Sequence, residues 1–407
     1  MIYNSNAVYW IFMQSVIGVG SRKLLPIIDR FGSARNFCEC RYEDLKETGL
    51  LSKKELDKFS KLTLDDCRKI MSVCNEKAYK IITPNDKEYP KRLAQIPNPP
   101  AVLYVYGEMP DIDNEVAIAM VGTRKCSERG KSIARELSAR LTAAGAVVVS
   151  GGAMGIDASA HIGAIRAGGK TYAVLGCGLN YPYLAANAQL REDIAQNGAL
   201  ISEFPPNAAA SKFTFPIRNR IISGLCLGTI IVEATHSSGS LITVDHALEQ
   251  GRDIFVIPGE ISDPLYAGSN RLIRDGAIAI TTPYDVLSEY NDFYPHKLNL
   301  DGTKETITCD DPSEVDSIND VVPIIESEMK QDDEDVKCVV DIDLDGLTDS
   351  AKILLNEFKK SDSEYFDIIS ANCNLDPSLA IAALTELEIM GIVTAQPGGR
   401  YILNIGG

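Results

Sequence analysis

Along the central part of the chain, short apolar runs rich in β-branched residues alternate with longer stretches whose apolar positions recur at helical spacing. The runs are almost continuously apolar, which is typical of strands buried on both faces of a parallel sheet. This alternation predicts an α/β fold in which a mostly parallel sheet carries helices on both faces. The expected strands are 116–121, 146–150, 171–175, 199–202, 229–232 and 253–257, and the expected helices are 128–144, 157–167, 185–196 and 240–249.

Helical patterns precede this region. Residues 5–80 are expected to form short helices, and the segment 16–24 (Val-Ile-Gly-Val-Gly-Ser-Arg-Lys-Leu) is similar to a helix-hairpin-helix turn. In such a turn, glycines permit a tight bend and backbone N–H groups can face a phosphate. The alternative is a helical packing or protein-contact module, and the pattern leaves both roles open.

The C-terminal end has the pattern of a winged helix. Helices are expected at 350–358, at 365–370 and from Asp376-Pro377 onward, with the aspartate as N-cap and the proline at the first helical position. Two strands joined by Pro-Gly-Gly follow within 391–403. The third helix, 377–390, contains Glu386 and Glu388 and no lysine or arginine. It would attract phosphate poorly, which favours protein contact or self-association.

The charge of the chain is concentrated in one segment. The formal net charge is −16 at pH 7, a sign that disfavours a nucleic-acid partner. Residues 296–345, however, hold 16 acidic and 4 basic residues, a net of −12, so the rest of the chain carries about −4. An acidic disordered linker is expected there. The predicted domains are 1–80 (helical, similar to SAM or helix-hairpin-helix modules), 81–295 (the α/β domain), 296–345 (the linker) and 346–407 (the winged helix).

The cysteines and histidines give no sign of a metal site. Ten cysteines are scattered without a C-x-x-C pair, and only four histidines are present. This usage predicts reduced, mostly buried thiols in the cytoplasm. No apolar run reaches the roughly 18 residues of a membrane span, and the first residues lack the features of a secretory signal. Neither a membrane association nor a bound metal or cofactor is therefore expected.

Glycine-rich turns follow the first three expected strands. They are Gly122-Thr123-Arg124, Ser150-Gly151-Gly152 and Gly176-Cys177-Gly178. Glycines let backbone amides approach an anion at a helix N-terminus, and parallel sheets bind ligands at the carboxyl ends of their strands. The turns match neither the G-x-G-x-x-G dinucleotide fingerprint nor a Walker A loop. Together they predict a phosphate-binding site, although a single such turn also occurs for purely structural reasons.

A segment after the fourth expected strand interleaves cations with aromatic residues. Its sequence over 211–220 is Ser-Lys-Phe-Thr-Phe-Pro-Ile-Arg-Asn-Arg. Cations can neutralise phosphates, and an exposed aromatic ring can stack on a base. Pro216 is expected to open a helix through Ile222, on which Arg218 and Arg220 point in different directions. One arginine would then bind a nucleic-acid backbone while the other holds the fold. The alternative is a loop with a core phenylalanine and surface charges.

Several motifs, in their order and spacing, resemble the DprA/Smf family of DNA-processing proteins. They are Met-Val-Gly-Thr-Arg-Lys-Cys-Ser at 120–127, Ser-Gly-Gly-Ala-Met-Gly-Ile-Asp-Ala at 150–158, Phe-Pro-Ile-Arg-Asn-Arg-Ile-Ile-Ser-Gly at 215–224 and Val-Glu-Ala-Thr-His-Ser-Ser-Gly-Ser-Leu-Ile-Thr at 232–243. The resemblance covers about residues 80–290. It departs from the family pattern at Thr123, where serine is usual, and at Gly152 and Met154. Thr123 keeps the hydroxyl that serine would supply, and the changes at Gly152 and Met154 leave the backbone amides in place.

The resemblance implies a Rossmann-like domain that binds single-stranded DNA, protects incoming DNA and loads the RecA recombinase during natural transformation. It also implies a homodimer through that domain and no enzymatic activity. The family's DNA contacts map onto Arg124, Lys212 and Phe215. The whole site expected for single-stranded DNA and its phosphates is Gly122, Thr123, Arg124, Ser150, Gly151, Gly152, Lys212, Phe215, Arg218, Asn219, Arg220, Ser238, Gly239 and Ser240.

A nucleotide-binding enzyme is the alternative. The DprA/Smf family is similar in fold to the cytokinin-activating (LOG-type) phosphoribohydrolases, whose Pro-Gly-Gly-x-Gly-Thr-x-x-Glu motif carries a catalytic glutamate. The corresponding stretch here, 235–244, has no such carboxylate. Asp157 and His161 are four residues apart on one expected helix, but capping and packing are the simpler roles for them. Glu203 and Glu233 each end a strand, and Glu233 lacks a matching acidic partner.

Overall fold

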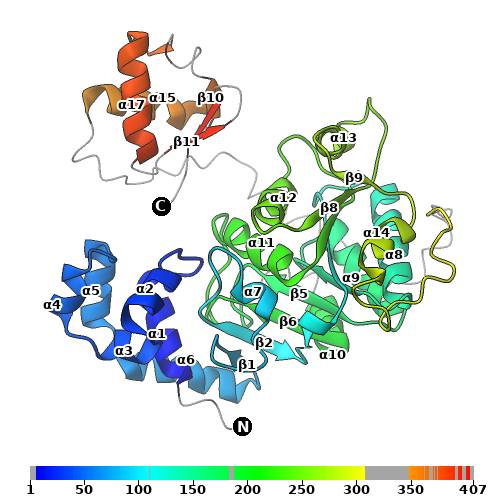
Figure 1. Cartoon of the computed structure of the whole chain (residues 1–407), viewed down its shortest axis with the longest axis horizontal. Helices are drawn as coiled ribbons and strands as arrows, with labels where there is room; N and C mark the ends of the chain where they lie inside the picture. Colours follow the sequence, from blue (N-terminus) through cyan, green and yellow to red (C-terminus); the bar gives the residue numbers. More distant parts are fainter. Residues whose placement is uncertain are drawn as a thin grey trace. The chain divides into compact units, whose positions relative to one another are not determined.

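The computed structural model describes residues 6–109, 111–182 and 188–307, and residues 348–403 apart from 362, 366–369, 371, 374, 390–392 and 397–399. The chain divides into two compact units, Met1–Ile324 and Ile325–Gly407 (Figure 1). No helix within the described residues is long and apolar enough to cross a bilayer. The same residues bring together no group of three or more potential metal ligands.

A nine-stranded sheet forms the centre of the first unit, in the order β1-β2-β6-β5-β4-β3-β7-β8-β9. The strands from β6 across to β9 run parallel, whereas β1 and β2 extend the β6 edge in antiparallel pairing. The mostly parallel α/β sheet predicted from the apolar runs is therefore confirmed. The strands are β1 Lys80–Ile82, β2 Leu103–Gly107, β3 Ala117–Val121, β4 Val147–Ser150, β5 Thr171–Leu175, β6 Gly198–Ser202, β7 Gly228–Ile231, β8 Asp253–Val256 and β9 Ile278–Ala279.

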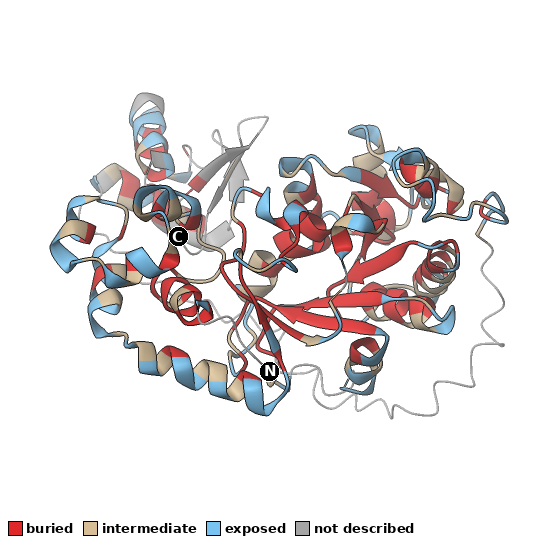
Figure 2. Cartoon of the chain, turned by 60° about the horizontal axis from the view of Figure 1, so that its bottom comes forward, coloured by how far each residue is buried: buried red, intermediate tan, exposed pale blue. Residues whose placement is uncertain are grey.

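Helices cover both faces of the sheet, and Figure 2 shows the buried strands between helices whose outer sides are exposed. Leu137 of α8 and Ala160 of α9 belong to the core on one face. Ile221 of α11 and Val244 of α12 belong to the core on the other. The helices of this region are α7 Lys91–Ala94, η1 Ile112–Asn114, α8 Glu128–Ala143, α9 Ile156–Arg166, α10 Ala188–Asn197, α11 Thr214–Leu225, α12 Ser240–Glu249, η3 Pro264–Tyr266, α13 Ala267–Arg274 and α14 Tyr284–Asn291.

One predicted helix boundary is wrong in an informative way. The sequence predicts a helix that opens at Pro216 and continues through Ile222, and α11 does continue through Ile222 to Leu225 but begins two residues earlier, at Thr214. A proline anywhere in the first turn is tolerated, because the N–H groups of that turn have no intrahelical acceptor. The earlier start places Phe215 on the helix itself rather than in the loop before it.

The segment 296–307 is packed against the first unit, although the charge pattern placed it in a disordered linker. The backbone N–H of Asn299 donates to the carbonyl of Ala144 at 2.9 Å. Leu298, Leu300 and Ile307 pack on the core beneath α8 and α14. Apolar residues spaced between the acidic ones therefore extend the folded unit at least to residue 307. The remainder of the predicted linker, from 308, lies outside the described residues.

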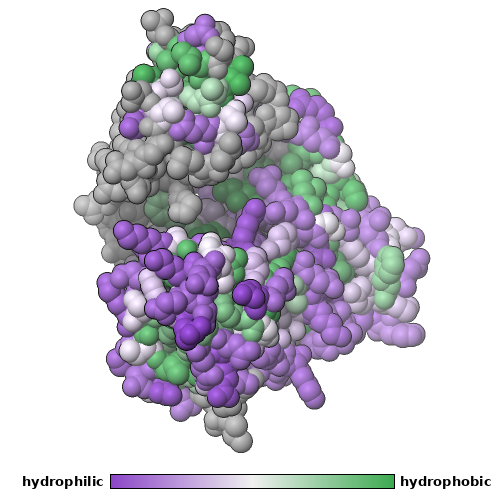
Figure 3. All heavy atoms as spheres, turned by 60° about the vertical axis from the view of Figure 1, so that its left-hand side comes forward, coloured by the Kyte–Doolittle hydropathy of each residue, from purple (hydrophilic) through white to green (hydrophobic). Residues whose placement is uncertain are grey.

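Within residues 6–79, six helices precede the sheet and share its compact unit. Phe12, Phe37 and Phe59 meet edge to face at their centre, with ring centroids 5.5 to 6.5 Å apart. The same core includes Tyr104 of β2, so the helices pack directly on the sheet edge. Figure 3 shows one face of the molecule, on which hydrophilic side chains cover most of the described surface. The helices are α1 Ala7–Ile17, α2 Leu24–Phe31, α3 Ala34–Glu39, α4 Tyr42–Glu47, α5 Lys53–Lys61 and α6 Leu64–Glu76.

The glycine turn between α1 and α2 docks on the sheet domain. Gly18 and Gly20 adopt positive φ angles of 86° and 75°, as expected of the predicted tight turn. The backbone N–H of Gly20 donates to Oε1 of Glu203 at 3.2 Å. A Cβ added to Gly20 would collide with the side chain of Ile217 in α11. The turn is thus used for packing within the chain, and phosphate contact by it stays a prediction.

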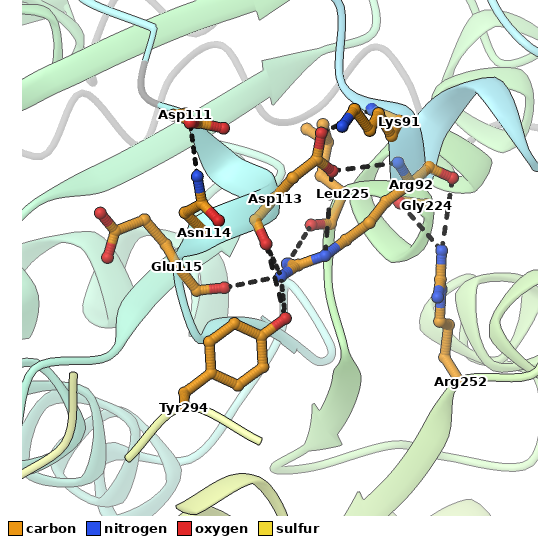
Figure 4. Close-up of polar contacts among 10 residues, drawn as sticks. All are labelled: Lys91, Arg92, Asp111, Asp113, Asn114, Glu115, Gly224, Leu225, Arg252 and Tyr294. Atoms are coloured by element: carbon orange, nitrogen blue, oxygen red, sulfur yellow. Dashed lines mark hydrogen bonds and ion pairs between the residues drawn. The ribbon is translucent and has the colours of Figure 1, made fainter. Parts of the chain in front are cut away.

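A buried arginine joins the segments that enter the sheet at the amino ends of its strands (Figure 4). Nη2 of Arg92 donates to the carbonyls of Asp113 (2.9 Å) and Glu115 (2.8 Å) and to the hydroxyl of Tyr294 (2.6 Å). Nη1 of Arg92 donates to the carbonyl of Leu225 at 3.4 Å. Glu115 precedes β3 and Leu225 ends α11 before β7. One guanidinium therefore fixes the approach to two neighbouring strands, at the end of the sheet opposite the glycine turns.

The second unit is a small α/β assembly. Leu354 and Phe358 of α15 pack against Leu384 and Leu387 of α17. Three antiparallel strands follow the order β10-β12-β11. A helix was expected at 365–370, but its first residue, Tyr365, belongs to β10, and residues 366–369 lie outside the described ones. The winged-helix assignment therefore stays a prediction. The elements are α15 Asp349–Ser361, β10 Ser363–Tyr365, α17 Pro377–Ile389, β11 Val393–Gln396 and β12 Arg400–Leu403.

Candidate functional site

The predicted turns meet at one end of the sheet because their strands are parallel neighbours. β3 and β7 lie side by side, but the chain leaves them in opposite directions, toward β4 and toward β8. Such a reversal separates the two following loops and opens a crevice at the carboxyl ends of the strands, where open α/β sheets bind ligands. The loop 122–127 lies on the β3 side of this switch point, and the loop 232–239 lies on the β7 side.

The loop after β3 is held by Glu233, at the end of β7. The backbone N–H of Thr123 donates to the carbonyl of Glu233 at 2.8 Å. The carboxylate of Glu233 is fully buried and accepts hydrogen bonds from the backbone N–H and the hydroxyl of Ser127, the N-cap of α8. The hydroxyl of Tyr266 bonds the same carboxylate. Gly122 lies against Ile156, and Arg124 is left exposed at the tip of the loop.

The loop after β4 is tightly packed. The hydroxyl of Ser150 is buried and donates to the carbonyl of Met120 at 2.6 Å, so it faces the sheet and not the surface. Gly152 and Gly155 adopt positive φ angles of 67° and 80°. A Cβ on Gly155 would lie 2.6 Å from the carbonyl oxygen of Arg124. The two glycine turns therefore approach each other so closely that a larger residue at 155 would separate them.

Arg218 holds the ends of β4 and β5 together. Arg218 is 4% exposed, and its guanidinium donates to the carbonyl of Gly151 at 2.7 Å and to the carbonyl of Val174. The backbone N–H of Gly151 donates to the carboxyl of Asp157 at 3.1 Å. A Cβ on Gly151 would collide with both side chains. Burial raises the pKa of Asp157, an effect that the nearby charge of Arg218 opposes.

Arg220 is the second arginine of the segment, and it is buried as well, at 1% exposure. Its Nη2 lies 2.8 Å from the carboxylate of Glu203, at the end of β6. That carboxylate also accepts the Gly20 N–H, and the carbonyl of Glu203 accepts from Nε2 of Gln14 at 2.9 Å. The prediction that one arginine holds the fold applies to both side chains here, and contact of either one with a nucleic-acid backbone stays a prediction. Arg218 and Arg220 both point inward and hold the fold.

Phe215 and Arg124 are far apart in sequence and meet in the structure. The half-buried ring of Phe215 packs on Gly176, where a Cβ would lie 2.7 Å from the ring. The guanidinium carbon of Arg124 lies 4.7 Å from the ring centroid, and that of Arg218 lies 5.9 Å away. The ring is half-buried, lies between two cations and belongs to α11, so it is neither in a loop nor a fully buried core side chain. Lys212 is exposed and lies just before α11, three residues before Phe215.

The serine loop before α12 adjoins α11. Asn219 Nδ2 donates to the carbonyl of Gly239 at 3.4 Å. The hydroxyls of Ser238 and Ser240 lie 2.8 Å apart, and no atom lies within 4 Å of a Cβ placed on the exposed Gly239. The structure thus places the N-terminus of α12 beside the helix that carries Phe215. Because helix N-termini attract anions, this loop suits a phosphate.

The acid–base pair of the enzyme alternative does not form. Nδ1 of His161 lies 2.8 Å from the hydroxyl of Thr171, which itself donates to the carbonyl of Val148. Because the Thr171 hydroxyl donates its only hydrogen to Val148, it must act as the acceptor for His161, and Nδ1 therefore carries the proton. Burial, together with Arg218, lowers the pKa of His161 to about 3, so the ring is neutral at physiological pH. Asp157 instead accepts the Gly151 N–H.

Sequence reasoning missed the partners that support the site. The sequence offers Glu233 as a candidate catalytic carboxylate and does not show that Ser127 donates to it. A signal was available, because a serine directly before a helical pattern is a typical N-cap. No local signal could have shown that Glu203 would meet both Arg220 and Gly20, since these residues lie in three separate segments.

Comparisons with known proteins bear on the same region. The family model described as DNA recombination-mediator protein A matches residues 80–291. DNA processing protein DprA of Bacillus subtilis (strain 168) is 40% identical over 221 residues, 54% of this chain and 74% of that protein. DNA processing protein DprA of Streptococcus pneumoniae is 44% identical over 206 residues, 50% of this chain and 72% of that one. An X-ray structure of DNA processing protein A from Streptococcus pneumoniae aligns with a TM-score of 0.62 at 33% identity, and covers 71% of this chain and 99% of that chain.

Proposed function

The chain belongs to the DNA recombination-mediator protein A family, and from that premise we propose that it binds single-stranded DNA at the switch point between β3 and β7. The observation that carries the proposal is the contact between Arg124 and Phe215, which puts a solvent-accessible cation on an aromatic ring at the carboxyl ends of the strands. Single-strand binding sites combine these two features, because the cation attracts the phosphates and the ring stacks on bases.

Phosphate binding would come from the exposed cations and from backbone groups. Arg124 and Lys212 are both exposed, on the loop after β3 and before α11 respectively. Gly239 leaves open space at the start of α12. Arg218 contributes its charge from below the surface, because its side chain is buried. The proposed site thus keeps Arg124, Lys212, Phe215 and the loop 238–240 as contacts, and assigns Ser150, Arg218 and Arg220 to its support.

We also propose the finer roles that the family implies. The bound single strand would be protected, and the RecA recombinase would be loaded onto it in the cytoplasm, with the protein acting as a homodimer through its sheet domain. The family match supports these roles, because it spans the whole sheet domain from β1 to α14. Stimulation of RecA filament formation on single strands tests the loading role, and light scattering tests for twice the 44.3 kDa chain mass.

A binding protein is preferred over an enzyme because the candidate carboxylates are engaged within the fold. Glu233 accepts three hydrogen bonds in a buried position, and Asp157 is buried beside Arg218. Neither is held at the surface where it would reach a reacting bond. Incubation with nucleoside monophosphates should accordingly release no free base. Turnover that disappears in Glu233→Gln would favour the hydrolase instead.

The strand preference tests the proposal directly. Because stacking requires an unpaired base, single strands should bind more tightly than a duplex of equal length at matched ionic strength. Fluorescence anisotropy across a salt series, with single-stranded, duplex and mononucleotide ligands, measures this. Equal affinity for the single strand and the duplex would count against the proposal.

A further inference from the structure

Phe213 is an exposed aromatic residue that does not pack into the hydrophobic cores of the described residues. The residue is 41% exposed, and it belongs to none of the hydrophobic clusters formed by the described residues. It is the N-cap residue of α11, in the same turn that positions Phe215. A single exposed hydrophobic residue carries no meaning by itself, so its neighbours decide what it can do.

A cation accompanies the Phe213 ring. Nζ of Lys212 lies 5.3 Å from the ring centroid. Lys212 takes part in no salt bridge among the described residues, so its charge is not neutralised by a neighbouring carboxylate. An aromatic ring beside such a cation offers a face for a base and a charge for the phosphate attached to it.

The other aromatic ring of this turn is already in contact with arginine. The guanidinium carbons of Arg124 and Arg218 lie 4.7 and 5.9 Å from the centroid of Phe215, and Gly176 lies against its edge. A base that approaches Phe215 must therefore share or displace the Arg124 contact. Among the described residues, Lys212 is the one cation in contact with the ring of Phe213, so a base can reach this ring without disturbing the arginines.

We propose that Phe213 is a second base-stacking platform of the single-strand site. It holds the nucleobase next to the one bound at Arg124 and Phe215, while Lys212 binds the phosphate between them. The proposal rests on the proposed function, because it extends the same site by one nucleotide. Phe213 should accept any base, because every base has a π face and stacking alone does not distinguish one base from another.

An abasic ligand separates stacking from phosphate contact. Binding of an oligothymidylate of about 12 nucleotides is compared with binding of an abasic oligomer that has the same phosphates. Phe213→Ala should weaken oligothymidylate binding by roughly 5- to 150-fold, the size of one lost stacking contact, and leave abasic binding and the salt slope unchanged. Phe213→Tyr should retain the affinity. Phe293→Ala is the matched control, because Phe293 is 79% exposed and lies outside the site.

A tryptophan at this position gives a second, spectroscopic measurement. The one natural tryptophan of the chain, Trp10, is buried in the N-terminal core. The new indole in Phe213→Trp should therefore dominate the change in emission on binding, with quenching by oligothymidylate and none by the abasic oligomer. This variant keeps an aromatic ring and avoids reliance on a truncation.

The outcomes distinguish failure of the Phe213 platform from failure of single-strand binding itself. If the wild-type protein prefers single strands and Arg124→Ala loses affinity, but Phe213→Ala binds oligothymidylate like wild type and the indole emission is unchanged, only the second platform is overturned. An equal loss of affinity for both oligomers in Phe213→Ala overturns it too. If the wild-type protein shows no single-strand preference, the proposed function itself fails.

Discussion

Arginine has two different roles in this molecule, and burial separates them. Arg124 is exposed and lies on an aromatic ring, free to meet a phosphate. Arg218 and Arg220 are buried and hold backbone carbonyls or a carboxylate. A guanidinium suits both roles because it is always charged and presents donors in a fixed plane. The consequence is that substitutions in one short motif should affect binding and stability separately.

Removal of the exposed cations tests the binding role. Arg124→Ala or Lys212→Ala should weaken single-strand binding for every base sequence, and flatten the plot of log affinity against log salt by up to about one unit per lost contact. Thermal stability should hardly change, since both side chains are exposed. Arg68→Ala, on the exposed surface of α6, is the control. Wild-type affinity in both site variants would rule out this cation assignment.

His161 makes stability depend on pH. Its folded-state pKa of about 3 lies below the usual value near 6.5, so the unfolded chain takes up a proton that the folded chain refuses. The stabilisation is complete above about pH 6.5 and is lost as pH falls toward 3. Between pH 7.5 and 5.5, the wild type should lose about 1 kcal/mol more than His161→Asn, measured by urea unfolding. The buried Asp157 acts in the opposite direction, because its pKa is raised. Parallel pH profiles for the two proteins would contradict the neutral, buried histidine.

At the scale of elements, α11 is the part on which the site depends. Its first turn carries the aromatic residues, its middle donates Arg218 to β4 and β5, and Arg220 reaches β6. The N-terminal glycine turn contacts the same helix through Ile217. One helix therefore links the position of the N-terminal helices to the geometry of the binding loops, and Glu203 is the residue where these contacts meet.

The buried pair of Glu203 and Arg220 should matter for stability. Arg220→Met or Glu203→Gln each leaves a buried partner without its counter-charge, at a cost of roughly 3–5 kcal/mol in the free energy of unfolding. The double variant should cost less than the sum, because no lone charge remains. Urea unfolding followed by Trp10 fluorescence measures all three.

The exposed pair of Arg68 and Asp65 provides the comparison for that experiment. Its side chains are 62% and 77% exposed, so Asp65→Asn should change stability by no more than about 1 kcal/mol. A cost in Arg220→Met as small as in Asp65→Asn would show that the buried pair is not essential to the docking of α11.

On the scale of the whole molecule, the chain has separate cores in its two units. The cores of the first unit involve the sheet and the N-terminal helices, whereas Leu354, Phe358 and Leu384 belong to the core of the second. Units with separate cores need not unfold together. Urea unfolding followed by Trp10 fluorescence, which reports the first unit, should then differ in midpoint from unfolding followed by far-ultraviolet circular dichroism.

A core substitution in the second unit tests this separation. Leu384→Ala should destabilise that unit by about 2–5 kcal/mol, because it leaves a cavity, and the Trp10 transition should not move. Ala351→Gly would be a milder change in the same core. A joint shift of both transitions by Leu384→Ala would mean that the units unfold as one.

The sequence by itself determined the α/β architecture of the central domain, because strand and helix periods are local properties of the chain. It also placed the glycine turns after the strands and began α17 at Pro377. The tertiary structure decided the rest. It added β1 and β2 at the sheet edge, turned both Arg218 and Arg220 inward, brought Arg124 onto Phe215, and assigned Glu203 and Glu233 as supports. Each of these depends on segments distant in sequence, and whether a charged side chain faces water or a buried partner is settled only when those segments pack together.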